Sequence, residues 1–114
     1  MTMAMRAKSE QLVAAFEKRL GNDRAELIAN RAAACGSADR SGFEVVRFIA
    51  HRIVGSARLF GCDDLAGPAG RVEELVDAGA DAGAIVQAVN DLAERIETTL
   101  ANGLTVPDWS RPQA

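Results

Sequence analysis

The sequence predicts an all-α fold, an antiparallel four-helix bundle with a short additional N-terminal helix. Its apolar residues recur at three- and four-residue steps and almost never alternate as in a half-buried strand. Short breaks containing Gly and Asp separate these segments, and brief connections make sequential helices neighbours in a bundle. With 114 residues, 48% of them hydrophobic, the chain has the size and composition of one domain. We therefore expect a helical bundle over residues 1–103 and an irregular tail over residues 104–114.

The N-terminal region is predicted to form two helices. The first begins at Ser9, a suitable N-cap, and ends before Gly21-Asn22, which indicates a break or only a kink. Asp23 then caps a second helix, for which Gly36 is a typical C-terminal stop. The first helix has an apolar stripe made of Leu12, Val13, Phe16 and Leu20.

The next helix carries His51, the only histidine of the chain. It is predicted to begin at Asp39 or Ser41 and to end near Gly61. Because each helical residue turns the chain by roughly 100°, His51 lies opposite the apolar side and points away from the core. That apolar side consists of Val46, Ile49, Ile53, Ala57 and Phe60.

Two further helices are predicted. Asp63 is placed to cap the first of them, although Pro68 favours a later start near Leu65 or Gly67, and Gly79 ends it. Asp81 opens the last helix, which ends at Asn102-Gly103. Its apolar stripe consists of Ile85, Val89, Leu92, Ile96 and Leu100. In the tail beyond it, Trp109 is expected to fold back on the bundle or, less often, to anchor a partner.

Composition argues against several classes of protein. The net charge of −3 and the lack of basic clusters argue against binding to nucleic acid through its phosphates. Residues 1–8 lack the apolar core of a signal peptide, and no segment is apolar for long enough to span a membrane, so we expect a cytoplasmic protein. Cys35 and Cys62 indicate neither a disulfide framework nor a zinc site, and we expect small buried or loop thiols.

The face of the helix around His51 carries the best clue to function. Arg47, Val54, Gly55 and Arg58 share this face with the histidine. An interior helix glycine costs about 1 kcal/mol relative to alanine, so Gly55 should offer a compensating advantage. Without a side chain, it leaves room for a bulky group on the imidazole or for the close approach of another protein.

The run from His51 to Gly61 resembles the signature of histidine-containing phosphotransfer (HPt) domains, roughly His-x-x-Lys-Gly-x-(Ala/Ser)-x-x-x-Gly. His51, Gly55, Ala57 and Gly61 match this pattern in register. The resemblance continues at Leu65 and at the Val72-Glu73 pair. It implies a phosphoryl carrier in which His51 takes a phosphoryl group from a receiver aspartate, or from a kinase through such a domain, and passes it to another receiver.

The resemblance also suggests roles for neighbouring residues. The lysine of the family pattern is Val54 here, so Arg47 or Arg58 would have to neutralise the phosphoryl charge, unless both arginines merely form a solvated face. Glu73 stands at the family's glutamate position. It is the candidate acceptor that fixes the tautomer of His51, the alternative being that it faces water.

The implied partners are response-regulator receiver domains and a hybrid or sensor histidine kinase. Phe48, Val54 and Leu59 flank the histidine face and are candidates to dock a receiver, while Arg47, Arg52 and Arg58 would steer its acidic pocket. Alternatively, Phe48 and Leu59 belong to the seam with neighbouring helices.

No nucleotide-binding loop is present, so the chain is not expected to be the kinase. We expect a phosphoryl carrier rather than an enzyme, the alternative being that it is classed with the phosphorelay phosphotransferases. We expect a monomer. The chain is also expected to need no cofactor or metal of its own, because magnesium would come with the receiver. Two other readings remain: an HPt-like adaptor that binds without accepting phosphate, and a plain helical interaction domain.

Overall fold

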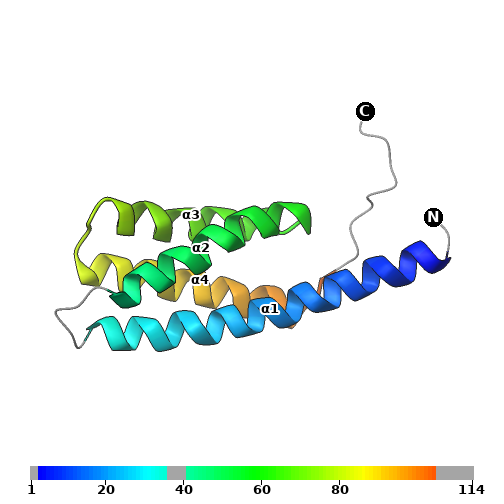
Figure 1. The fold of residues 1–114 in the computed structure, drawn as a ribbon, viewed down its shortest axis with the longest axis horizontal. Coiled ribbons are helices and arrows are strands. Elements are labelled where there is room, and N and C mark those ends of the chain that lie inside the picture. Colours follow the sequence, from blue (N-terminus) through cyan, green and yellow to red (C-terminus); the bar gives the residue numbers. More distant parts are fainter. Residues whose placement is uncertain (1–2, 36–40, 105–114) are drawn as a thin grey trace.

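In a computed structural model, the described backbone covers residues 3–35 and 41–104, and the described side chains cover residues 7–31 and 41–104. Four helices, and no strand, occur in these ranges: α1 (Met3–Cys35), α2 (Ser41–Leu59), α3 (Asp63–Asp77) and α4 (Ala82–Asn102). Successive helices run antiparallel (Figure 1). The main contacts join α1 to α2 and α4, and α3 to the same two helices. The predicted all-α four-helix bundle is confirmed.

Helix α1 corrects the prediction for the N-terminal region. The break at Gly21-Asn22 is wrong, and the short additional helix is simply the first part of α1 (Figure 1). Ser9 is not an N-cap but a buried residue inside the helix, and Leu12 is 54% exposed rather than part of the core. The buried positions explain the continuity, because they keep steps of three and four residues across the glycine: Ser9, Val13, Phe16, Leu20, Asp23 and Leu27.

Helix α2 agrees closely with its prediction. It begins at Ser41, whereas the alternative start, Asp39, lies outside the described residues. Gly61 follows it with a φ of 73°, and the amide of Cys62 donates to the carbonyl of Ala57 over 2.8 Å. This arrangement is a Schellman motif, which explains why a glycine stands at this position. The buried side of the helix consists of Phe43, Val46, Ile49, Ala50, Ile53 and Ala57.

The ends of α3 and α4 show one difference from prediction. Helix α3 starts at Asp63, with Cys62 as its N-cap, so Asp63 is the first helical residue rather than the cap and Pro68 lies inside the helix. Gly79 ends α3 with a φ of 66°, and Asp81 caps α4 by accepting a hydrogen bond from the Ala84 amide over 2.8 Å. The helix stop at Gly79 and the N-cap at Asp81 were both predicted.

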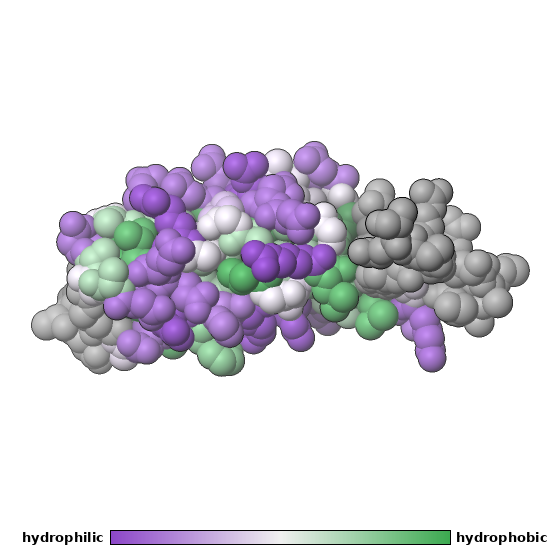
Figure 2. Space-filling model, turned by 90° about the horizontal axis from the view of Figure 1, so that it is seen from above, coloured by the Kyte–Doolittle hydropathy of each residue, from purple (hydrophilic) through white to green (hydrophobic). Residues whose placement is uncertain are grey.

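Some predictions lie outside the described residues: the helix stop at Gly36, the side chain of Cys35, and Trp109 with the tail from residue 105 onward. Within the described ranges, none of the helices combines the length and the apolar character that crossing a membrane requires. Seen from the side opposite α1, the surface is mainly hydrophilic with small separate hydrophobic areas (Figure 2).

Candidate functional site

His51 lies in the middle of α2, on the side opposite its buried stripe. Its side chain is 69% exposed. The orientation follows from the packing of α2, because Ile49, Ala50 and Ile53 are buried and thereby fix the rotation of the helix. The imidazole is therefore accessible to another protein although the backbone that carries it is anchored in the core.

A hydrogen bond joins His51 to the neighbouring helix. Nδ1 of His51 lies 2.8 Å from Oε1 of Glu73 in α3, and the Glu73 side chain is 21% exposed. Because a carboxylate only accepts hydrogen bonds, Nδ1 must carry the proton and donate it. In the neutral imidazole, Nε2 then keeps its lone pair. Glu73 thus lies in the position expected of a tautomer-fixing acceptor and does not simply face water.

Arg47 extends this contact into a network between α2 and α3. Its Nε donates to Oδ1 of Asp77, its Nη2 lies 3.4 Å from Oδ2 of Asp77, and Nη2 lies 3.8 Å from Oε1 of Glu73. The hydrogen bond with Asp77 and the charges of both carboxylates raise the pKa of the Arg47 guanidinium further above its usual value. Sequence reasoning missed Asp77, although its position four residues after Glu73 places it on the same helix face.

Arg52 connects the other side of α2 to α1. Its Nη2 donates to Oδ1 of Asp23, a residue that is 2% exposed, and its Cζ lies 5.7 Å from the centroid of the Phe48 ring. The prediction of Asp23 as a helix cap is therefore wrong, because it lies inside α1. Burial raises the pKa of Asp23, and the nearby Arg52 charge opposes that rise. The signal was present in the sequence, since Asp23 occupies a position of the apolar stripe.

The surface beside His51 is open at Gly55. Gly55 is exposed, and an added Cβ would meet no atom within 4 Å. Phe48 is 63% exposed and Leu59 is 61% exposed, so the alternative that they belong to an interhelical seam is wrong. Val54, by contrast, is half-buried and packs against the core, so its predicted exposure is wrong. The structure thus brings Phe48, Gly55 and Leu59 onto the accessible surface.

Arg58 and Cys62 complete the candidate residues. Arg58 is exposed in the last turn of α2, and its guanidinium forms no hydrogen bond or ion pair with residues 7–31 or 41–104. Cys62 is a buried thiol whose pKa is raised by burial and, to a lesser extent, by Asp64 and Asp63. A raised pKa keeps the thiol protonated and weakens it as a nucleophile.

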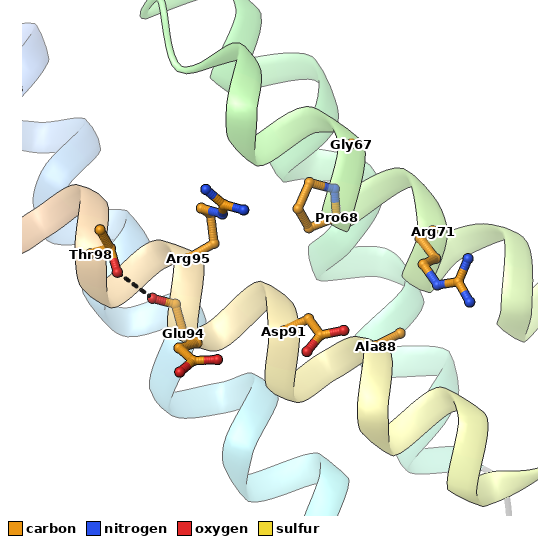
Figure 3. Close-up of a pocket in the computed structure, with 8 residues that line it drawn as sticks. All are labelled: Gly67, Pro68, Arg71, Ala88, Asp91, Glu94, Arg95 and Thr98. Carbon is orange, nitrogen blue, oxygen red and sulfur yellow. Dashed lines mark hydrogen bonds between the residues drawn. The ribbon is translucent and has the colours of Figure 1, made fainter.

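A separate groove of about 500 Å³ lies between α3 and α4. On α3 its lining residues lie on the side opposite Glu73, and no residue of α2 contributes to it. Acidic and basic side chains occur in equal number, and Thr98 Oγ1 donates to the Glu94 carbonyl over 3.1 Å (Figure 3). The groove is therefore independent of the histidine site. It is lined by Gly67, Pro68, Arg71, Ala88, Asp91, Glu94, Arg95 and Thr98.

Comparison with known proteins provides a family assignment. The family model of the Hpt domain matches residues 9–102, a range that includes parts of all four helices. Searches among curated proteins and among solved structures found no match. Hpt domains are phosphoryl carrier modules of two-component signalling, in which they interact with receiver domains and kinases. Because the match extends over well more than half of the sequence and includes His51, the chain belongs to the Hpt domain family.

Proposed function

We propose that this protein is a phosphoryl carrier of a two-component phosphorelay and that His51 is the residue that is phosphorylated. One observation supports this role above all others. The exposed imidazole donates through Nδ1 to Glu73, which leaves Nε2 with a free lone pair on the accessible side of α2. A histidine on a solvated surface without a function needs no such acceptor from a neighbouring helix.

The transfer step follows from this geometry. Nε2 of His51 attacks the phosphorus atom of a receiver's aspartyl phosphate. The N–P bond forms while the P–O bond to the aspartate breaks, and the leaving carboxylate takes the bonding electron pair. The ring becomes positively charged, and the Glu73 carboxylate stabilises that charge through the Nδ1 proton. The reverse reaction delivers the phosphoryl group to the aspartate of another receiver.

Neutralisation of the phosphoryl charge is assigned to Arg58. Phosphoryl transfer depends largely on positioning and on electrostatic neutralisation. Val54 stands where the family pattern has lysine, and Arg47 is already paired with Asp77 and Glu73. Arg58 lies two turns after His51 on the same face, and its side chain has no partner among the described residues. Arg47 instead pairs with Asp77 and with Glu73, the acceptor of the imidazole hydrogen bond.

The receiver is proposed to dock beside the imidazole, on the side of α2 that faces α1. Phe48 and Leu59 supply exposed apolar surface there, and Gly55 lets a partner backbone approach closely. Apolar contacts combined with nearby arginines suit a partner whose phosphorylated pocket is acidic. The kinase partner is a sensor or hybrid histidine kinase, reached through its receiver.

The test is transfer from receiver domains phosphorylated with radiolabelled acetyl phosphate. The wild-type chain is expected to take up label that acid removes and base does not, as for a phosphoramidate. His51→Gln should take up none, and since His51 is the only histidine, no second imidazole can substitute for it. Label that persists in the His51→Gln variant would show that the phosphorylated residue is a different one.

Val54 supports a second candidate function, an adaptor that binds a receiver without accepting phosphate. A half-buried valine in the lysine position leaves the chain without the family's usual cation there. The same experiment separates the two functions when binding is measured in parallel by calorimetry. Binding with transfer supports the carrier, whereas tight binding without transfer at any receiver concentration supports the adaptor.

A further inference from the structure

Asp23 is the only buried charged side chain among residues 7–31 and 41–104. It interrupts an otherwise apolar seam of α1, between the fully buried Leu20 and Leu27. A hydrophobic residue at such a position would pack against the core without any cost of desolvation. The acid therefore needs an explanation other than the stability of the bundle.

The partner of Asp23 leads directly to the docking surface. Arg52 Nη2 donates to Asp23 Oδ1, and the same guanidinium lies over the ring of Phe48, 5.7 Å from its centroid. Phe48 is the most exposed of the large apolar side chains that the structure describes, at 63%. A continuous series of contacts thus runs from a buried carboxylate in α1 to an exposed ring one turn before His51.

This arrangement is energetically costly. Burial raises the pKa of Asp23 in spite of the neighbouring Arg52, so desolvation outweighs the attraction between the two charges. Nε of Arg52 is also buried and has no hydrogen-bond partner among the described residues. Replacing a buried ion pair by packed apolar residues is often neutral or stabilising, so the pair is weak evidence for a role in stability.

We propose that Asp23 is a positioning residue for receiver docking, which acts by holding Arg52 over Phe48 and thereby fixing the ring beside His51. This inference rests on the proposed function and adds a residue of α1 to it. An exposed side chain that is already ordered loses less conformational entropy when a partner binds. Arg52 then serves to order an apolar contact and is not the free steering charge that the sequence suggested.

The experiment compares transfer kinetics of Asp23→Asn and the wild type with a labelled phosphorylated receiver as substrate. We expect KM to rise about two- to tenfold, the range for ordering one side chain, while kcat stays unchanged because no group at His51 is altered. Arg52→Lys should raise KM similarly, since lysine keeps the charge near Asp23 but lacks a planar group to stack on Phe48. Glu97→Gln is the matched control, because it removes an acid that pairs α1 with α4 through Arg24, and it should change neither constant.

A double-mutant cycle separates positioning from a general structural role. If Asp23 acts through Phe48, then Asp23→Asn should change KM in the wild type but not in a Phe48→Ala background. Melting temperatures of all variants are measured beside the kinetics. An equal KM effect in both backgrounds, an unchanged KM, or a loss confined to kcat would overturn the inference.

Failure of the proposed function has a different signature. It would appear as a wild-type chain that accepts no phosphate. In that event, calorimetry with a receiver domain activated by beryllofluoride still decides the inference, because the dissociation constant should rise in Asp23→Asn and not in Glu97→Gln. A wild-type chain that neither transfers nor binds would overturn both proposals.

Discussion

The two flanks of His51 differ in kind. Toward α3, charged groups are paired with one another: Arg47 with Asp77 and Glu73, and Glu73 with the imidazole. Toward α1, the surface consists of an exposed ring, an open glycine and an exposed leucine. Under the proposed function, the flank toward α3 would prepare the imidazole for phosphoryl transfer, and the flank toward α1 would bind the receiver. The two roles would then lie on different sides of the same helix.

The bundle arrangement explains this division. Helix α2 has its main contacts with α3 on one side and α1 on the other. Acidic residues of α3 at positions 73 and 77 reach the α2 side that carries Arg47, whereas the seam of α1 sends a single acid, Asp23, to Arg52. If the division is real, substitutions on the α3 flank should change the chemical step, and substitutions on the α1 flank should change the encounter with the partner.

The largest effect is expected at Gly55. Gly55→Gln places a long side chain in the open space beside His51, where the phosphoryl group and the receiver aspartate would meet under the proposed function. Transfer should fall about a hundredfold or more, since a misplacement of about 1 Å at a reacting centre can have that effect. Stability should hold or rise by less than about 1 kcal/mol, because glutamine is the better helix former. Transfer assays and thermal melts on the same preparation measure both quantities.

Gly55→Ala is the matched control for that variant. It improves helix propensity as well but adds only a methyl group, for which the structure has room. We expect transfer to fall far less than in Gly55→Gln, because one methyl group fills little of the open space. A stable Gly55→Gln protein that transfers at the wild-type rate would contradict the assignment of this surface to docking.

The next largest effect tests the α3 flank. Glu73→Gln keeps an oxygen near Nδ1 but removes the carboxylate charge that, under the proposed function, would stabilise the positively charged ring of the phosphorylated histidine. A hydrogen bond to a charged group is worth about 1 kcal/mol more than a neutral one, so kcat should fall about fivefold with little change in KM. Glu74→Gln, at the exposed neighbouring position, should leave transfer unchanged. A rise in KM without loss of kcat would place Glu73 in recognition instead.

Much of the fold was predictable because helix signals are local. The caps at Gly61, Gly79 and Asp81 follow from residue type alone. The predicted break at Gly21-Asn22 was wrong because tertiary packing of α1 outweighs the local cost of a helix glycine, about 1 kcal/mol. An added Cβ at Gly21 would lie 4.0 Å from Leu100 Cδ1, so the helix passes close to α4 at this point. Periodicity across the glycine was the better guide.

The candidate site was predictable to the extent that it depends on one helix face. The exposure of His51, the openness at Gly55 and the approach of Glu73 agree with expectation. The pairings of Arg47 and Arg52 were not foreseen, because they depend on how α1 and α3 are rotated against α2, and no local pattern specifies that rotation. The rotation of α1 and α3 against α2 also leaves the side chain of Arg58, and not those of Arg47 and Arg52, without a described partner.

A smaller effect on transfer is expected at Arg58. Arg58→Ala should slow transfer about two- to fivefold, the range for an exposed charge interaction, and should weaken its dependence on salt. Arg95→Ala removes the same charge at the groove between α3 and α4 and should have no such effect (Figure 3). Transfer rates at low and high ionic strength test this. Equal losses in the two variants would mean that only net charge matters.

The smallest effect concerns the pH dependence of stability on the α1 flank. The pKa of Asp23 in the folded chain is raised above its ordinary value of 3.8, mainly by burial. A raised pKa means that the folded state holds this proton more tightly than the unfolded state does. The contribution of protonated Asp23 to the free energy of unfolding is therefore complete below about pH 3.8. It is lost as the pH rises through the pKa that Asp23 has in the folded chain.

Relative to Asp23→Asn, the wild type should accordingly lose stability as the pH rises above 3.8. Urea unfolding of both proteins at a series of pH values measures this, and the other titrating groups cancel in the difference. If the free energy of unfolding of the wild type instead rose with pH relative to that of Asp23→Asn, Arg52 would attract the carboxylate more strongly than burial penalises it. Asp23 and Arg52 would then form a stabilising ion pair, and their contact would no longer lower the free energy of unfolding.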